Sequence, residues 1–270
     1  MTAAVRPAAT VMLVRDTPEE RIEVLLLRRH PDLVFVAGAH VFPGGAVDPG
    51  DDAPGTTSVV TGMDDATASE LLDLAAGGLA YWVAAVRETF EEAGLLLAST
   101  LRGDDPWLDP RQAARLHEAR PELDAGRLSM AELCRREGLQ LDCGALRSFG
   151  RWITPIGAPR RYDTRFFVAP APPRPEVRVD QREAVAAEWF EPVEALERFA
   201  RGDIDLILPT ERSLAVLAEY RSTTDLLAWL DGAPAEVDDH GGRRVASPAD
   251  EAGPPSRPPP RAAPLPVGDP

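Results

Sequence analysis

Three glutamates crowd one side of a single predicted helix, and this constrains the chain more than any other feature. Residues 79–93 carry apolar side chains at the ~3.6-residue period of an amphipathic helix. Glu88, Glu91 and Glu92 then share an arc of about 100°, with side chains only ~5–6 Å apart. Like charges this close destabilise a helix unless a cation lies among them. Arg87, four residues before Glu91, can neutralise only one of them.

The simplest interpretation is a charged, solvent-facing helix surface, which is what most acidic runs are. The surrounding pattern argues against it. The glutamates belong to Arg87–Leu95, which reads R-E-x-x-E-E-x-G-L, and Phe42–Gly45 upstream reads F-P-G-G. At ordinary residue frequencies the two segments together are very improbable by chance. We therefore interpret the glutamates as part of a functional motif.

Composition excludes several classes of function. The 29 basic residues against 44 acidic ones give a net charge of −15, which disfavours non-specific nucleic-acid binding. All of the basic residues are arginines, so lysine Schiff-base chemistry and a lysine-bearing phosphate loop are excluded. The two cysteines, Cys134 and Cys143, form no CxxC pair, so we expect neither a disulfide framework nor a thiolate metal site.

The distribution of apolar residues predicts a soluble protein. The longest apolar runs, such as Ala8–Val14, fall well short of the ~20 residues of a membrane span. Residues 1–16 do not have the pattern of a signal peptide. We expect a cytoplasmic location, with neither a membrane nor a nucleic acid as partner.

Strand-like and helix-like runs alternate along the chain and predict an α/β fold with a mixed sheet. Ala8–Val14 and Ile22–Arg29 read as a hairpin, and Gly94 is the expected left-handed cap of the acidic helix. Ala53–Asp65 reads as an exposed excursion, and the highly charged Pro106–Gln140 as helical. The other predicted elements are strands at Ala145–Ile153, Thr164–Ala169 and Ala184–Phe190, and helices at Ala66–Leu74, Pro192–Ala200, Thr210–Tyr220 and Thr224–Leu230.

The last 40 residues have a different character. Between Pro248 and Pro270 the chain is rich in proline and has almost no large apolar residue. Such a composition cannot bury enough apolar surface to order the chain. We predict one domain over residues 1–230 and a disordered proline-rich tail over 231–270.

The glutamate motif resembles the signature of the Nudix hydrolases. Gly45 matches the first glycine of that signature, Asp51 stands where the family has a glutamate, and Arg87–Leu95 matches the remainder. Thr89 occupies a position that is usually apolar. In this chain 35 residues separate Asp51 from Arg87, far more than the family usually has. The resemblance therefore implies an insertion of roughly residues 52–79 inside the motif.

An insertion at this place is similar to that of the peroxisomal-type coenzyme A diphosphatases, a Nudix subgroup. Segments 26–45 and 152–167 look like that subgroup too, and the likeness extends from about Ala8 to Tyr220. It implies a Nudix fold, with a mixed β-sheet sandwiched between helices and an extra helical insertion. Segment 106–140 is expected to form a helical cap over the cleft.

The resemblance also implies a metal-dependent reaction. An anionic diphosphate and an acidic helix meet only through divalent cations, and Mg²⁺ or Mn²⁺ suits oxygen ligands. By resemblance, Glu88, Glu91, Glu92 and the carbonyl of Gly45 are the metal ligands. Glu88, Glu91 and Arg87 form the catalytic set, in which Arg87 orients Glu91. Whether Glu91 is the third ligand or the general base stays open.

The expected substrate is a small-molecule nucleoside diphosphate derivative, with coenzyme A or acyl-CoA first. Alternatives are an ADP-ribose or dinucleotide pyrophosphatase, and a non-catalytic nucleotide-sensing module. Nudix proteins are often dimers, so a homodimer is possible. Glu183 and Glu188 are candidates for an additional acid, although each is equally well an exposed strand residue. The residues expected to bind substrate are Arg28, Arg29, Gly44, Arg160 and Arg161.

Overall fold

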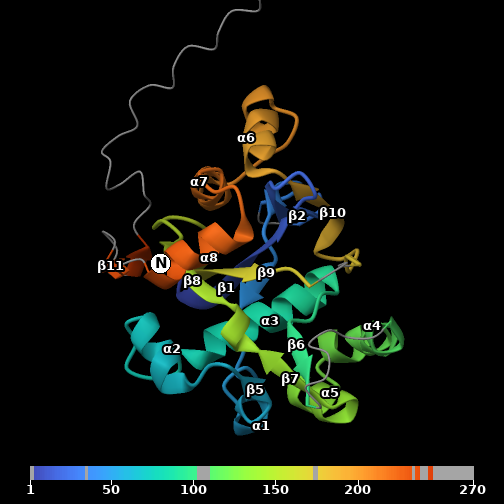
Figure 1. Ribbon diagram of the computed structural model, residues 1–270. Coiled ribbons are helices and arrows are strands. Elements are labelled where there is room, and N and C mark those ends of the chain that lie inside the picture. Colours follow the sequence, from blue (N-terminus) through green and yellow to red (C-terminus); the bar gives the residue numbers. More distant parts are fainter. Residues whose placement is uncertain are drawn as a thin grey trace, which may run out of the picture.

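A seven-stranded mixed sheet forms the centre of the computed structural model (Figure 1). The structure describes residues 3–33, 36–101, 110–172, 176–232, 235–237 and 243–245. The strand order is β10-β2-β1-β9-β8, with β3 beside β2 and β4 beside β1. The strands are β1 (Val5–Asp16), β2 (Ile22–Arg29), β3 (His40–Val41), β4 (Gly44–Ala46), β8 (Arg147–Ile153), β9 (Arg161–Pro170) and β10 (Ala184–Phe190).

The predicted hairpin is confirmed as the antiparallel pair β1 and β2, in which Val14 lies opposite Val24. The amide of Thr17 donates to the Arg21 carbonyl at 2.7 Å and closes the turn. On its other side β1 runs parallel to β9, while β8 and β10 are antiparallel to their neighbours. The combination confirms the mixed sheet of the predicted α/β fold.

Side chains alternate across the sheet and fill two separate cores. On β2, Leu25 and Leu27 face the core beneath α3 (Leu79–Ala93), whereas Val24 and Leu26 face the opposite core. Helices α6, α7 and α8 cover that opposite core, above and to the left of α3 in Figure 1. The sheet is therefore sandwiched between helices, as predicted. These three helices span Pro192–Arg201, Leu208–Leu217 and Thr223–Gly232.

Helix α3 has the predicted bounds, and Gly94 caps it with φ of 73°. Trp82, Val86 and Phe90 are almost fully buried against the sheet. A Cβ at position 94 would lie 2.6 Å from the His117 ring, so glycine is required both by the left-handed backbone and by close packing. Because the apolar stripe packs against the sheet, it determines the rotation of α3 about its axis and hence the direction in which the glutamates point.

The insertion within the motif is more ordered than an exposed excursion. It forms α1 (Pro54–Thr57), β5 (Val60–Thr61) and α2 (Asp65–Leu71). Val59 belongs to the polar stretch 53–65 that was expected to be exposed, yet it is buried in the α3 core, as is Leu72 directly after α2. Strand β5 pairs in parallel with β7, and β7 pairs with β6, in a small three-stranded sheet. The latter two strands are Leu139–Asp142 and Ala98–Thr100.

Two helices occupy most of the charged segment 106–140. They are α4 (Pro110–Asp124) and α5 (Met130–Glu137), and the latter begins at a Ser129–Glu132 capping box. The predicted helix ends early, because Gly138 caps α5 and the following residues form β7. Residues 102–109 lie outside the described part of the chain. A short 3₁₀ turn, Cys143–Ala145, follows β7.

The predicted disordered tail differs from the structure at two points. Helix α8 continues to Gly232, and a short antiparallel pair forms between β11 (Ala235–Val237) and β12 (Arg243–Val245). The stretch from 235 to 245 contains none of the tail's prolines, which removes the main obstacle to strand pairing. The proline-rich residues from 246 onward lie outside the described residues. Within the described part of the chain, no helix has the length and apolarity needed to span a membrane.

Candidate active site

Arg87 joins the acidic side chains of the motif. Its Nη1 donates to Glu88 Oε1 at 2.9 Å and to Glu91 Oε2 at 2.8 Å, and its Nη2 donates to the Ala46 carbonyl at 2.8 Å. The side chain is only 10% exposed, so these charge-assisted bonds form away from bulk water. Arg87 therefore binds the carboxylates of both Glu88 and Glu91.

Asp51 lies directly against Arg87 despite the insertion between them. The guanidinium binds both carboxylate oxygens, Nε to Oδ1 at 2.9 Å and Nη2 to Oδ2 at 3.0 Å. Asp51 is 3% exposed, and its Oδ2 also accepts the Asp48 amide at 2.8 Å. The shorter aspartate thus makes a bidentate pair with the motif arginine. The insertion leaves this contact intact because the chain departs directly after Asp51 and returns at the start of α3, the helix that carries Arg87.

Glu92 is the most deeply buried acid of the cluster. The residue is 5% exposed, and its Oε2 accepts the backbone amide of Gly44 at 2.9 Å. Burial, and then the charge of Glu88, raise the pKa of Glu92 well above the usual carboxyl value. Gly44, expected to bind substrate, here positions Glu92 through its N–H.

Gly45 allows the backbone of β4 to approach Glu88. A Cβ at position 45 would lie 2.5 Å from the Glu88 carboxyl carbon, so any side chain there would displace the carboxylate. Burial raises the pKa of Glu88 to about 7, and burial likewise raises the pKa of Glu91. These carboxylates are expensive to ionise without a cation.

The oxygen atoms of the acidic cluster are chemically suited to bind a hard divalent ion. The cluster consists of three carboxylates beside a close backbone strand, and such oxygen donors are the ligands that Mg²⁺ prefers. Each bond to Arg87 or Gly44 uses one oxygen of its carboxylate and leaves the other. Within the described ranges, no three acidic, histidine or cysteine side chains already converge on one cation position. Binding an ion at all three carboxylates therefore requires these side chains to rotate.

The two adjacent arginines of β2 point to opposite faces of the sheet. Arg29 follows Leu25 and Leu27 toward the α3 side, where its charge acts on Glu92, while Arg28 lies in a pocket of about 330 Å³ with His40 and Glu188. Only Arg29 is on the side of the glutamates.

The other predicted arginines lie farther along the sheet. Arg161 is opposite Val5, four register positions from Ala9, which faces Gly45. Its Nε donates to the Thr154 carbonyl at 3.0 Å, and Arg160 is exposed on the preceding turn. The structure does not bring these two together with the glutamates, and their roles stay predictions.

Sequence reasoning missed Arg120, a buried residue of α4. Its Nη2 donates to the Glu91 carbonyl and its Nη1 donates to the Arg178 carbonyl at 2.6 Å. It therefore satisfies an orphan carbonyl in the last turn of α3 and links that turn to α4. Nothing in the spacing of the charged segment distinguishes Arg120 from its exposed neighbours. In Figure 1, α3 runs toward the region between β10 and α4.

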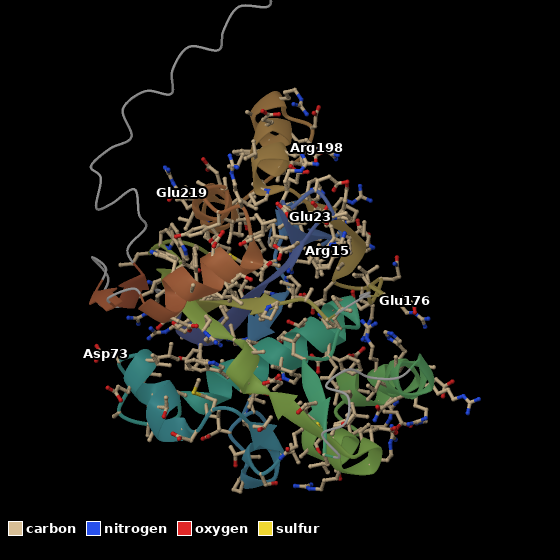
Figure 2. The ribbon with its side chains drawn as sticks, in the orientation of Figure 1. Arg15, Glu23, Asp73, Glu176, Arg198 and Glu219 are labelled. Atoms are coloured by element: carbon tan, nitrogen blue, oxygen red, sulfur yellow. The ribbon has the colours of Figure 1, made fainter. Side chains whose placement is uncertain are left out.

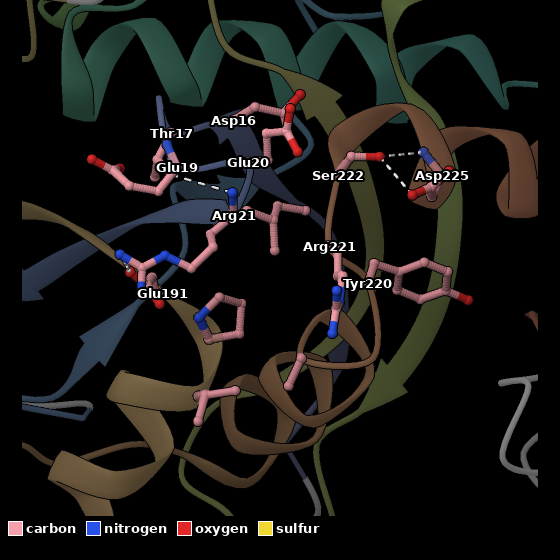
Figure 3. Close-up of a pocket in the computed structure, with 14 residues that line it drawn as sticks. Asp16, Thr17, Glu19, Glu20, Arg21, Glu191, Tyr220, Arg221, Ser222 and Asp225 are labelled. Carbon is pink, nitrogen blue, oxygen red and sulfur yellow. Dashed lines mark hydrogen bonds and ion pairs between the residues drawn. The ribbon is translucent and has the colours of Figure 1, made fainter.

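A large pocket lies elsewhere on the molecule. It has a volume of about 830 Å³ and is lined by the β1–β2 turn, the start of α6 and the α7–α8 connection (Figure 3). Some of its polar side chains bind each other, as in the Arg21–Glu191 ion pair at 3.0 Å and the hydrogen bond from Ser222 Oγ to Asp225 at 2.7 Å. No residue of the glutamate motif lines it, so its size does not make it the candidate active site.

Comparison with known proteins identifies the family. The model of the NUDT19 Nudix domain matches residues 62–215. The acyl-coenzyme A diphosphatase NUDT19 of Gallus gallus is 32% identical, over 82% of this chain and 70% of the relative. The Homo sapiens protein of the same name is 30% identical, over 82% and 67%.

A solved structure agrees with the sequence relatives. The crystal structure of a Nudix hydrolase from Alicyclobacillus acidocaldarius aligns with a TM-score of 0.64 and 31% identity. The alignment covers 84% of this chain and 96% of that protein. The chain therefore belongs to the Nudix hydrolases, enzymes that generally need divalent metal ions.

Proposed function

We propose that this chain hydrolyses the diphosphate bond of coenzyme A or acyl-CoA, with Mg²⁺ or Mn²⁺ as cofactor. Water adds to one phosphorus and the bridging P–O bond breaks, so the products are 3′,5′-ADP and 4′-phosphopantetheine or its acyl form. The relatives named acyl-coenzyme A diphosphatase support this substrate. The observation that carries the proposal is the intact acidic cluster, in which Arg87 binds Asp51, Glu88 and Glu91 together.

The side chains of the cluster would hold the metal. Glu88, Glu91 and Glu92 each offer a carboxylate oxygen, and the Gly45 carbonyl belongs to the strand that approaches Glu88. A bound divalent ion neutralises diphosphate charge and lowers the pKa of water. Arg87 keeps the Glu88 and Glu91 carboxylates oriented, and the Gly44 amide does the same for Glu92. Much of phosphoryl-transfer catalysis consists of such positioning and electrostatics.

Arg29 is the best supported substrate-binding arginine. Its side chain is 19% exposed, and its Nε is buried without a hydrogen-bond acceptor among the described residues. A guanidinium with unused donors beside an acidic cluster suits a phosphate oxygen. Arg28, Arg160 and Arg161 would contact only parts of the substrate distant from the diphosphate.

A substrate panel with product identification tests the proposal. Coenzyme A, acetyl-CoA, ADP-ribose and a dinucleotide are incubated with Mg²⁺ or Mn²⁺ and separated by liquid chromatography. Release of 3′,5′-ADP from the CoA substrates, faster than AMP from ADP-ribose, is the expected result. Preferential AMP release would instead favour an ADP-ribose or dinucleotide pyrophosphatase. Tight binding without turnover would favour a nucleotide-sensing module.

A further inference from the structure

Another pocket lies beside the acidic cluster, at the end of α3 that carries Glu91. It has a volume of about 430 Å³ and lies between α4 and the segment 178–182. Glu176, just before that segment, is labelled in Figure 2 near the end of α3 and above α4. The polar residues that line the pocket are His117, Arg120, Asp124, Arg178, Asp180 and Arg182.

Main-chain contacts join this pocket to the motif helix. Arg120 Nη2 donates to the Glu91 carbonyl, and its Nη1 donates to the Arg178 carbonyl at 2.6 Å. The Arg178 amide in turn donates to the Ala93 carbonyl at 2.8 Å. Since the Glu91 side chain belongs to the acidic cluster, the cluster and the pocket adjoin across the last turn of α3.

The pocket is basic, although the whole chain has a net charge of −15. Its lining holds three arginines and two aspartates. Desolvation, and then the charges of Arg178 and Arg120, lower the pKa of His117, so this histidine is neutral at pH 7. The lining therefore carries a net positive charge beside a strongly acidic site.

Both aspartates of the pocket are already bound within the protein. The two oxygens of Asp180 accept the backbone amides of Glu183 and Ala184, each at 2.9 Å. Asp124 forms an ion pair with Arg182 across the pocket. Both carboxylates are largely buried. An anion that entered the pocket would therefore meet mainly guanidinium groups.

Arg178 has donors that a ligand could use. Its Nε and Nη2 both bond to one oxygen of Glu176, at 2.9 and 2.6 Å, and both side chains are at least half exposed. Such exposed pairs contribute little to stability, so a better acceptor can replace Glu176. A phosphate monoester is a better acceptor, because it presents about two negative charges and three oxygens to the planar guanidinium. The buried Nδ1 of His117 also lacks a hydrogen-bond partner among the described residues.

We propose that this pocket binds a phosphate monoester, the 3′-phosphate at the ADP end of the substrate, through Arg178 and Arg182. The inference rests on the proposed function, in which the diphosphate of coenzyme A lies at the acidic cluster. One ribose separates the 3′-phosphate from that diphosphate, which matches a pocket that adjoins the cluster. The two arginines thereby distinguish coenzyme A from nucleoside diphosphate derivatives without a 3′-phosphate.

Arg201 offers a matched control for Arg178. Replacing the Arg178 side chain leaves its two main-chain bonds in place. Like Arg178, Arg201 is about half exposed and pairs with an acid two residues away, Asp203, at 2.9 Å. It ends α6, the helix on which Figure 2 labels Arg198, at the top of the view and away from Glu176.

Isothermal titration calorimetry with two nucleotides tests the inference. 3′,5′-ADP and 5′-AMP differ only in the 3′-phosphate, and each is titrated, with Mg²⁺ present, into wild type, R178Q, R178K, R182Q and R201Q. We expect wild type to bind 3′,5′-ADP at least ~10-fold more tightly, as a charge-assisted hydrogen bond provides. R178Q and R182Q should lose most of that preference. R178K should keep part of it because it keeps the charge, and R201Q should keep all of it.

Kinetics provide a second measurement of the same preference. The ratio of kcat/KM for coenzyme A to kcat/KM for dephospho-coenzyme A should fall by a similar factor in R178Q and R182Q but not in R201Q. Equal unfolding temperatures of the five proteins show that the fold is retained.

The outcomes separate this inference from the proposed function. Equal binding of the two nucleotides to wild type would overturn the inference, as would an unchanged preference in both R178Q and R182Q. Inorganic phosphate that binds wild type but not R178Q, with no preference between the nucleotides, would also overturn it, since the pocket would then hold free phosphate. Turnover of coenzyme A in either case keeps the proposed function. A preference for 3′,5′-ADP that R178Q loses, without turnover of coenzyme A, would refute the proposed function and support the pocket.

Discussion

Replacing Arg87 by methionine should destabilise the protein strongly, because one guanidinium serves several buried acids. Asp51 is 3% exposed and bonded at 2.9 and 3.0 Å, so its carboxylate would lose its cation in a place without water. Breaking a buried pair by removing one partner costs ~3–5 kcal/mol. Asp51→Asn leaves the arginine with Glu88 and Glu91, so it should cost less, on the order of 1–3 kcal/mol.

The assay is urea unfolding in EDTA, followed by tryptophan fluorescence, for both single variants and the double variant. Since the double variant removes both charges of the pair, its cost should fall short of the sum by ~1–3 kcal/mol. Arg201→Met is the control, because the Arg201–Asp203 pair at 2.9 Å is more than half exposed. Its loss should cost under ~1 kcal/mol. Additive costs for Arg87 and Asp51 would refute the idea that they couple across the insertion.

Three further predictions follow from the site. Gly45→Ala should change stability by less than ~1 kcal/mol, since the new Cβ displaces the movable Glu88 carboxylate, but it should weaken Mn²⁺ binding ~10-fold in a titration. Gly44→Ala is the contrasting variant. Its Cβ would lie 2.4 Å from the Ala9 carbonyl, so it should lower the unfolding temperature. Arg120→Met should cost ~1–3 kcal/mol in urea unfolding, because the Glu91 and Arg178 carbonyls lose a buried donor; unchanged stability would show that the link to α4 contributes nothing. In metal-free protein, burial raises the pKa of Glu88 to about 7, so the native state keeps a proton that the unfolded chain releases. The contribution of Glu88 to stability should therefore fall as pH rises from about 4.5 to about 7. Over that range the unfolding temperature of the Glu88→Gln variant should decline less than that of the wild type.

The local pattern of the sequence was sufficient to predict α3. Its apolar stripe, Gly94 cap and three glutamates all lie where the period places them, because these features depend on neighbours within one helix. The hairpin of β1 and β2 follows for the same reason, since alternating apolar residues flank a short polar turn.

Long-range contacts were beyond such reasoning. The burial of Val59 and Leu72 in the insertion depends on a core surface supplied by α3. The role of Arg120 depends on how α4 packs across the end of that helix.

The arginines and late glutamates illustrate the same limit. Arg28 and Arg29 are adjacent residues of the same type, so the sequence does not distinguish them. The orientation of β2 in the sheet decides which of the two faces the glutamates. Glu183, just before β10, and Glu188, within it, were equal candidates by sequence. Only the pairing of β10 with β2 places Glu183 near Arg29 and Glu188 near Arg198. Residue type and spacing therefore predicted the chemistry of the site. The side of the sheet on which each arginine or glutamate lies depends on how the strands pair in the folded protein.

Glu92→Gln tests the central claim most directly. Glutamine keeps an oxygen for the Gly44 amide and removes a charge that is costly to bury, so the unfolding temperature in EDTA should not fall. With saturating Mg²⁺ or Mn²⁺, kcat for coenzyme A should drop by ~10²-fold or more if this carboxylate holds the ion. A well-folded Glu92→Gln protein that turns over coenzyme A at the wild-type rate would contradict the assignment of the cluster as a catalytic metal site.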